Sequence, residues 1–364
     1  MEIGIVQRES QLPLRTIPAA AINGRGPLTM LRNSLTLLNG ARAAVRLIQR
    51  EKPHVILGTG GYVCVPVFMA ARLLGIPSVV YLPDVVPGLA VRLLSRLATA
   101  TAGSVSDAAR YLGKNPRDFS ADLVDLVSSQ EPGKILQSTL VVVGYPVRPE
   151  LFDLDRAACR AAFGLRDDLP VLVVYGGSRG ARSINQAVAA LLPDLLAFAQ
   201  IIHICGREGD ASMLEAAAAR LPSELRERYQ FYPYLEAGER SMSAALGAAD
   251  VALCRSGAST LGELPAVGLP AVLVPYPYVH QDENADYLVR FGAARKVVDV
   301  GMLGDGPPND GPLYTELRRI LEATSEATSM RAEMAACSRS LARPSAAQQL
   351  ADLVLALAAR RRAA

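Results

Sequence analysis

The strongest chemical signal in the chain is the run VLVVYGGSRGAR at residues 171–182, a strand pattern that enters a glycine-rich turn and then a helix. Glycines let a backbone approach a ligand closely, and the first N–H groups of the helix carry a partial positive charge. The run therefore predicts a diphosphate site at Gly176, Gly177, Ser178 and Gly180. Taken alone, it fits a tight turn without a ligand equally well.

A second strand, loop and helix pattern is DVALCRSGASTLGE at residues 250–263. A helix that begins near Ser259 would offer a second anion site at its start. Glu263 would follow about one turn later on the same face, where a carboxylate could accept hydrogen bonds from both hydroxyls of a ribose. By itself, Glu263 is more typical of a solvated helix residue, and Arg255 of a surface arginine at a strand end.

A third segment is VPYPYVHQDENA at residues 274–285, which predicts a strand, a proline-rich loop and a helix. His280, Gln281 and Asn284 are spaced to share one face of that helix, and their neutral donors and acceptors suit sugar hydroxyls. A lone histidine such as His280 is more often structural than catalytic.

In the first half of the chain, YLPD ends a predicted strand and places Asp84 at the edge of an open α/β sheet where ligands bind. Asp84 is a weak candidate for a catalytic base, and an aspartate that caps a turn is the more ordinary interpretation. The turn GTGGY at residues 58–62 suits the floor of a cleft.

The elements that must position these residues alternate between short apolar runs and Ala- and Leu-rich helical patterns, which predicts βαβ units around parallel sheets. One such helix is expected over 87–100. A length of 364 residues favours two domains. We expect a first α/β domain at 1–146, a second at 147–340, and a C-terminal helix and basic tail at 341–364.

Composition excludes several classes of function. The 38 basic and 35 acidic residues nearly cancel, so no nucleic-acid partner is expected. The five cysteines and three histidines show no metal-ligand spacing, so neither a metal nor another cofactor is expected, and a reducing cytoplasm fits best. No apolar run is long enough to span a membrane, so any membrane contact should be peripheral.

With these segments in this order, the chain resembles the MurG family over about residues 1–350. GGSRGARSINQ, CRSGASTLGELPAVGLPAVLVPYP and HQDENA resemble the family's donor-site motifs, GTGGYVCVPVFMAARLLGIP resembles its acceptor-domain core, and VVGYPVR its interdomain turn. The resemblance implies a GT-B fold, in which two Rossmann-like domains face each other across a cleft. It also implies no obligatory metal, because helix N-termini and arginines can stabilise the departing UDP.

The activity that the resemblance implies is inverting transfer of N-acetylglucosamine from UDP-N-acetylglucosamine. The acceptor would be the 4-hydroxyl of undecaprenyl-pyrophosphoryl-N-acetylmuramoyl-pentapeptide, which gives lipid II in peptidoglycan synthesis. The implied roles are diphosphate binding by Gly176, Gly177, Ser178, Gly180, Ser256 and Gly257, ribose binding by Glu263, a uracil contact by Tyr234, sugar recognition by His280, Gln281 and Asn284, and lining of the cleft by Arg148 and Arg255.

Two departures from the family keep alternatives open. The family begins with a glycine-rich loop that bears a histidine often assigned as the base, and the alignment begins after it here, so we expect an incomplete first domain and leave the base unknown. Many members carry a His-Glu-Gln-Asn-like run where this chain has YLPD. A transferase with another lipid acceptor, such as a diacylglycerol, and a UDP-sugar-binding protein without turnover therefore remain alternatives.

Membrane contact has its own signal between Pro27 and Arg50. An apolar stripe, Leu28, Leu31, Leu35, Leu38 and Ala41, is flanked by Arg25, Arg32, Arg42, Arg46 and Arg50. The pattern fits binding to anionic lipid headgroups and fits an amphipathic core helix equally well. With the resemblance, it predicts a peripheral protein on the cytoplasmic face of the cell membrane.

Overall fold

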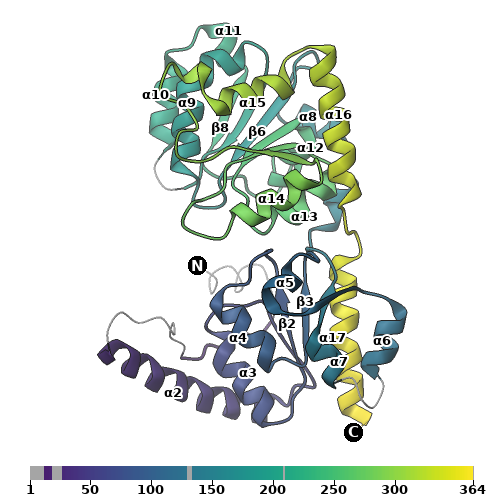
Figure 1. The fold of residues 1–364 in the computed structure, drawn as a ribbon. Helices are drawn as coiled ribbons and strands as arrows, with labels where there is room; N and C mark the ends of the chain where they lie inside the picture. Colours follow the sequence, from purple (N-terminus) through teal and green to yellow (C-terminus); the bar gives the residue numbers. More distant parts are fainter. Residues whose placement is uncertain (1–11, 19–26, 129–132, 208–209, 364) are drawn as a thin grey trace. The chain divides into compact units, whose positions relative to one another are not determined.

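The computed structural model describes residues 12–18, 27–128, 133–207 and 210–363. The chain divides into two compact units, each built on its own all-parallel sheet (Figure 1). The first unit comprises Met1–Leu82, Pro87–Val142 and Gln348–Ala364, and the second comprises Pro83–Val86 and Val143–Ala347. The predicted α/β class with two parallel-sheet domains is confirmed.

The first unit has a five-stranded sheet in the order β1-β2-β3-β5-β4. Its strands are β1 (Ile56–Gly58), β2 (Ser78–Leu82), β3 (Ala100–Gly103), β4 (Asn115–Asp118) and β5 (Thr139–Val142). Its helices are α2 (Pro27–Glu51), α3 (Cys64–Leu73), α4 (Leu89–Leu97), α5 (Ala108–Leu112), α6 (Ala121–Ser128), α7 (Gly133–Ser138) and α17 (Ala346–Ala363). The C-terminal helix α17 thus packs on the unit where the chain begins.

The structure corrects the helix expected over 87–100. Helix α4 ends at Leu97, and Ala100 already begins β3, whose four residues are all buried. Sequence patterns also missed β4, whose four residues are all exposed at the edge of the sheet. Small residues in β3 and a proline in β4 give weak strand propensity, so pairing reveals these strands: β3 with β2 and β5, and β4 with β5.

In α2, Ala44 and Ile48 are buried against α3, whereas Arg42, Arg46 and Arg50 are exposed. This part of the helix is therefore an amphipathic core helix with a solvated basic face. The side chains of Leu28, Leu31, Leu35 and Leu38, and all of Arg25, lie outside the described residues. Within the described part of the chain, no helix is long and apolar enough to cross a membrane.

The second unit has a six-stranded sheet in the order β11-β10-β9-β6-β7-β8. Its strands are β6 (Val171–Tyr175), β7 (Gln200–Ile204), β8 (Tyr229–Tyr232), β9 (Val251–Cys254), β10 (Ala271–Leu273) and β11 (Ala294–Lys296). Its helical elements are η1 (Pro149–Phe152), α8 (Arg156–Ala162), α9 (Arg182–Leu196), α10 (Ala211–Ala219), α11 (Ser223–Arg226), α12 (Met242–Ala248), α13 (Thr260–Val267), α14 (Asp282–Arg290), η2 (Pro308–Asp310), α15 (Pro312–Leu321) and α16 (Ser325–Ser340).

The central strands of this sheet are buried throughout, because helices cover both faces (Figure 1). Every residue of β6, β7 and β9 is buried, as expected for apolar runs in a parallel sheet. The apolar face of α9 packs on them through Ile184, Val188 and Leu191. This core holds the strand ends, and the loops that follow them, in fixed positions.

Candidate functional site

The order of the second sheet reverses between β6 and β9. From β6 the chain continues outward through β7 and β8, and it then returns to place β9 on the other side of β6. Ligands of open α/β sheets bind at the carboxyl ends of the strands at such a switch point. The two strands end in register, with Tyr175 opposite Cys254. Their following loops, which carry the first two motifs, therefore start side by side.

A cavity of about 740 Å³ lies at this point, between the two loops. Its walls come from the glycine-rich turn and the starts of α9 and α13, together with Tyr276, Gln281 and Asp299. Three arginines and one aspartate line it: Arg179, Arg182, Arg255 and Asp299. The cavity therefore favours an anion.

The glycine-rich turn is held by close backbone packing. Gly180 has φ of +87°, and a Cβ atom built there would lie 2.0 Å from the carbonyl oxygen of Cys205. The N–H of Gly180 also donates to the carbonyl of Gly177, at 3.0 Å. A side chain at residue 180 would push the turn away from β7, so glycine at this position sets the shape of the cavity wall.

Two helices begin at the cavity, and both starts line it. Helix α9 begins at Arg182 and α13 at Thr260, close to the starts predicted from the sequence. The first N–H groups of a helix have no partner within the helix and carry the positive end of its dipole. In α13 the N–H groups of Thr260, Leu261 and Gly262 donate to carbonyls of the preceding turn, so this end offers the cavity its dipole. Two positive helix ends meet at one cavity, which suits a ligand with two phosphate groups.

Gly176, Gly177, Ser178, Gly180 and Gly257 all line the cavity. Ser256 does not. It is fully buried, and its Oγ donates to the carbonyl of Gln281 at 2.9 Å. The loop turns Ser256 inward, so its side chain joins two loops instead of meeting a ligand, which corrects the expected diphosphate contact.

The third motif also differs from expectation. Helix α14 begins at Asp282, so His280 lies in the preceding turn, is exposed, and does not share a helix face with Asn284. Asn284 is fully buried, and its Nδ2 donates to the carbonyl of Ser256 at 3.0 Å. Gln281 lines the cavity, and its Oε1 accepts a hydrogen bond from the N–H of Tyr276 at 2.9 Å.

Glu263 lies one turn into α13, next to Ser259 and Arg148. Burial raises the pKa of this carboxyl, while a hydrogen bond from the Ser259 hydroxyl and the charge of Arg148 partly oppose the shift. Glu263 does not line the cavity itself. A half-buried acceptor beside an anion site is a fitting partner for neutral hydroxyl donors.

Three further candidates lie around these loops. Tyr234 follows β8 and is exposed, with the guanidinium of Arg207 3.9 Å from its ring centroid. Arg148 is exposed and lies 3.9 Å from Glu150. Asp84, in the segment that belongs to the second unit, accepts a hydrogen bond from Asn284 Nδ2 at 2.9 Å, and burial raises the pKa of its carboxyl.

Several residues that line the cavity were not named as binding residues from the sequence: Ser183, Ser259, Thr260, Tyr276 and Asp299. Ser183, Ser259 and Thr260 stand at the two helix starts, so the motifs themselves could have indicated them. Asp299 follows the edge strand β11 and carries no motif. Its place at the cavity depends on the order of the strands, which the sequence does not display.

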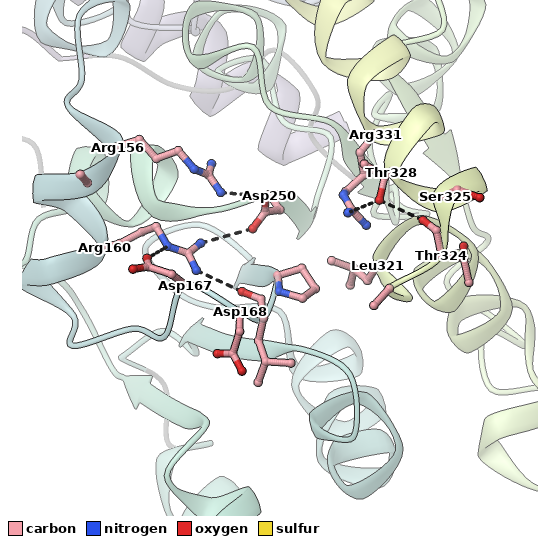
Figure 2. A pocket seen from close by; sticks show the side chains of 14 residues that line it. Arg156, Arg160, Asp167, Asp168, Asp250, Leu321, Thr324, Ser325, Thr328 and Arg331 are labelled. Atoms are coloured by element: carbon pink, nitrogen blue, oxygen red, sulfur yellow. Dashed lines mark hydrogen bonds and ion pairs between the residues drawn. The ribbon is translucent and has the colours of Figure 1, made fainter.

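A second cavity of about 690 Å³ lies at the opposite, amino-terminal ends of β6 and β9, between α8 and α16. Figure 2 shows Arg156 and Arg160 turned toward Asp250, and Arg331 turned toward the hydroxyl of Thr328. Arg160 lies 3.5 Å from both Asp167 and Asp250 and also donates to the carbonyl of Leu169. Arg156 lies 2.7 Å from Asp250. These pairs hold the strand starts together, and the site described above stays the better candidate for a ligand.

Among the described residues, no group of three or more His, Cys, Asp or Glu side chains is placed to hold a metal ion. The two α/β domains, each on a parallel sheet, have the GT-B fold, and an arginine-lined cavity lies at the switch point of the second. Residues 4–102 match the glycosyltransferase family 28 N-terminal domain and residues 171–304 its C-terminal domain. The chain belongs to glycosyltransferase family 28 and is a hexosyltransferase.

Curated relatives match nearly the whole chain. One is the UDP-N-acetylglucosamine–N-acetylmuramyl-(pentapeptide) pyrophosphoryl-undecaprenol N-acetylglucosamine transferase of Roseiflexus sp. (strain RS-1). It is 56% identical, and the match covers 100% of this chain and 83% of the relative's length. The enzyme of the same name from Desulforudis audaxviator (strain MP104C) is 34% identical over 98% of this chain and 88% of its own. The crystal structure of Acinetobacter baumannii MurG superposes on this chain with a TM-score of 0.67 at 26% identity. The match covers 98% of this chain and 87% of the MurG chain.

Proposed function

We propose that this chain transfers N-acetylglucosamine from UDP-N-acetylglucosamine to N-acetylmuramyl-(pentapeptide) pyrophosphoryl-undecaprenol, the reaction in the names of its relatives. The observation that carries the proposal is the cavity at the switch point between β6 and β9, where two helix starts converge. The diphosphate of the donor lies there. As the bond to the sugar breaks, charge develops on the departing UDP, and fixed N–H dipoles stabilise that charge without a metal.

The remaining parts of the donor extend from this diphosphate along neighbouring loops. The ribose lies near Glu263, because a carboxylate can accept both of its hydroxyl hydrogens. The uracil lies toward Tyr234, which follows β8 on the side of β6 away from β9. The sugar lies toward Gln281 and His280, on the side of β10. Ser256 and Asn284 support these loops from the interior.

Titration calorimetry with UDP, UMP and uridine tests the position of the diphosphate. UDP should bind more tightly than UMP, and UMP more tightly than uridine, because each phosphate added meets another helix start. Binding of UDP should release or take up no metal, so the same affinity is expected after treatment with a chelator. Equal affinity for UDP and uridine would show that the cavity does not hold the diphosphate.

Transfer itself is tested with labelled UDP-N-acetylglucosamine and a soluble analogue of the lipid-linked muramoyl acceptor. The labelled sugar should appear on the acceptor and free UDP should form in equal amount. UDP release without a labelled acceptor product would instead indicate another acceptor.

We also propose that the protein works at the cytoplasmic face of the membrane, where it binds anionic lipid through α2. The support is the exposed row of Arg42, Arg46 and Arg50, since each basic residue near an anionic surface contributes about 1 kcal/mol. Flotation with vesicles of anionic lipid should recover the protein, and vesicles of zwitterionic lipid alone should not. Replacing the three arginines with glutamine should reduce the recovery, and an unchanged recovery would exclude this surface.

A further inference from the structure

Arg255 connects the carboxyl ends of four neighbouring strands of the second sheet. It follows β9, and its Nη1 donates to the carbonyls of Val274 and Pro275 after β10, at 3.0 and 3.2 Å. The same nitrogen lies 2.7 Å from Oδ1 of Asp299, which follows β11. Its Nη2 donates at 2.7 Å to Oγ of Ser183 in the first turn of α9, the helix that follows β6.

Ser183 and Asp299 also contact each other, and this closes the network. Oγ of Ser183 donates to Oδ1 of Asp299 at 2.7 Å, so one carboxylate oxygen accepts from both the serine and the arginine. The side chains of Arg255 and Asp299 are only 11% and 16% exposed. The guanidinium is therefore fixed by four residues that follow three other strands, and Arg255, Ser183 and Asp299 form a closed side-chain network.

All three residues of this network line the cavity that holds the diphosphate in the proposed function. The tyrosine of the next loop, Tyr276, lies with its ring centroid 5.3 Å from the guanidinium carbon and also lines the cavity. A charged hydrogen-bonded pair with this little exposure is geometrically specific, and an arginine in such a fork cannot be replaced by lysine without loss of the geometry.

We propose that Asp299, together with Ser183, is a positioning residue that holds Arg255 in the orientation needed when UDP departs. This inference rests on the proposed function, because it needs a diphosphate in the cavity. Asp299 has two opposite effects on the donor. Its negative charge offsets that of Arg255 and weakens attraction for the diphosphate, while its hydrogen bond fixes the guanidinium where charge develops on the leaving group.

These two effects predict a split between donor binding and turnover. In Asp299→Asn the carboxylate charge is gone, so Arg255 attracts the diphosphate at least as strongly as before, and the KM for UDP-N-acetylglucosamine should not rise. The amide holds the guanidinium less firmly, and loss of alignment at a reacting centre costs about 10- to 100-fold in rate. We therefore expect kcat to fall by about 10- to 100-fold with KM unchanged or lower.

The experiment measures kcat and KM for the donor in the full chain, with Asp299→Asn, Asp299→Glu and Ser183→Ala, and with Asp305→Asn as a matched control. Asp305 is an exposed carboxylate six positions along the chain, so its replacement changes the net charge equally. Asp305→Asn should behave as the wild type. Asp299→Glu should recover part of kcat, and Ser183→Ala should lower kcat less than Asp299→Asn while leaving KM unchanged.

A double-mutant cycle tests whether Asp299 acts through Arg255. In an Arg255→Lys background the guanidinium is absent, so Asp299→Asn should add little further loss of kcat. An equal loss in both backgrounds, or an Asp299→Asn enzyme with wild-type kcat, would overturn the inference. If Asp299→Asn does not fold, Ser183→Ala decides the question, and an unchanged kcat in that variant overturns it. A wild-type chain that binds no UDP would refute the proposed function instead.

Discussion

Nε2 of His203, in β7, lies 2.9 Å from Oδ1 of Asn185, in α9. The amide nitrogen of Asn185 donates to the carbonyl of Cys205 at 2.8 Å and to Asp210 at 2.7 Å, so its oxygen must face the histidine. Nε2 therefore carries the proton, and Nδ1 accepts from the hydroxyl of Tyr229 at 2.9 Å. This buried network holds Cys205, against which Gly180 of the glycine-rich turn packs.

His203 makes folding stability depend on pH. Burial lowers its pKa from 6.5 to about 3, so the folded chain binds no proton there in a range where the unfolded chain does. Because the folded pKa is lowered, this contribution to stability is present above pH 6.5 and is lost as the pH falls toward 3. His203→Gln should show a smaller fall in the free energy of unfolding over this range, measured by urea denaturation.

His54 provides the control, because it is exposed. His54→Gln should keep the pH dependence of the wild type. Carboxylates that titrate in the same range are common to the wild type and both variants, so they do not contribute to the difference between the curves. A His203→Gln curve parallel to that of the wild type would contradict the assignment of a neutral, buried histidine.

Glu263→Gln should weaken UDP binding and strengthen the fold at the same time. Burial is the main cause of the raised pKa of this carboxyl, so its ionised form is disfavoured in the folded chain. The contribution of Glu263 to stability is present below its ordinary pKa of 4.5 and is lost as the pH rises through the folded pKa. At neutral pH the glutamine variant should therefore have the higher free energy of unfolding.

The same variant loses an ionised acceptor for the ribose. A hydrogen bond to a charged group contributes about 1.5–3 kcal/mol, so UDP affinity should fall by about 10- to 100-fold. Calorimetry with 2′-deoxy-UDP is the control, since one of the two donors is already absent and the loss should be smaller. An equal loss for both nucleotides would leave Glu263 with a structural role alone.

Gly180→Ala should damage the fold more than Gly177→Ala. Both glycines have φ of +87°, so each alanine suffers the left-handed strain of about 1–2 kcal/mol. A Cβ at residue 177 meets no atom within 4 Å, whereas one at residue 180 lies 2.0 Å from the carbonyl oxygen of Cys205. The overpacking adds about 1–3 kcal/mol for Gly180→Ala.

Urea denaturation measures the stability of both glycine variants. Calorimetry measures the affinity of the folded fraction for UDP, which reports whether the turn keeps its shape. Gly180→Ala should also bind UDP more weakly, because the turn must move to relieve the contact. Equal stabilities for the two variants would show that the turn does not pack against Cys205 in solution.

Arg160→Ala should destabilise the second unit and leave its UDP affinity unchanged. Arg160 joins Asp250 to the carbonyls that precede β6, at the amino-terminal ends of the strands (Figure 2). Arg156 still pairs with Asp250 in this variant, so the cost is that of buried carbonyl acceptors left without a donor, about 1–3 kcal/mol. Arg166→Ala is the matched control, because Arg166 pairs with Asp168 in an exposed position and should contribute little. Weaker UDP binding by folded Arg160→Ala would mean that the second cavity affects the donor site.

The sequence alone was enough for the fold class and for the places of the glycine-rich turn and of the α9 and α13 starts. These features depend on neighbouring residues: apolar runs predict buried parallel strands, and glycines before a helical pattern predict a tight turn. The order of the motifs also carried the family resemblance, which the comparisons confirm.

Only the tertiary structure decided which side chains meet the cavity. Ser256 and Asn284 stand in donor-site motifs, yet they turn inward because their polar atoms join the two loops to each other. Asp299 lies in no motif and reaches the cavity because β11 is the third strand from β6 on that side of the sheet. Strand order and side-chain direction arise from contacts between residues distant in the chain, and a local pattern in the sequence holds no record of them.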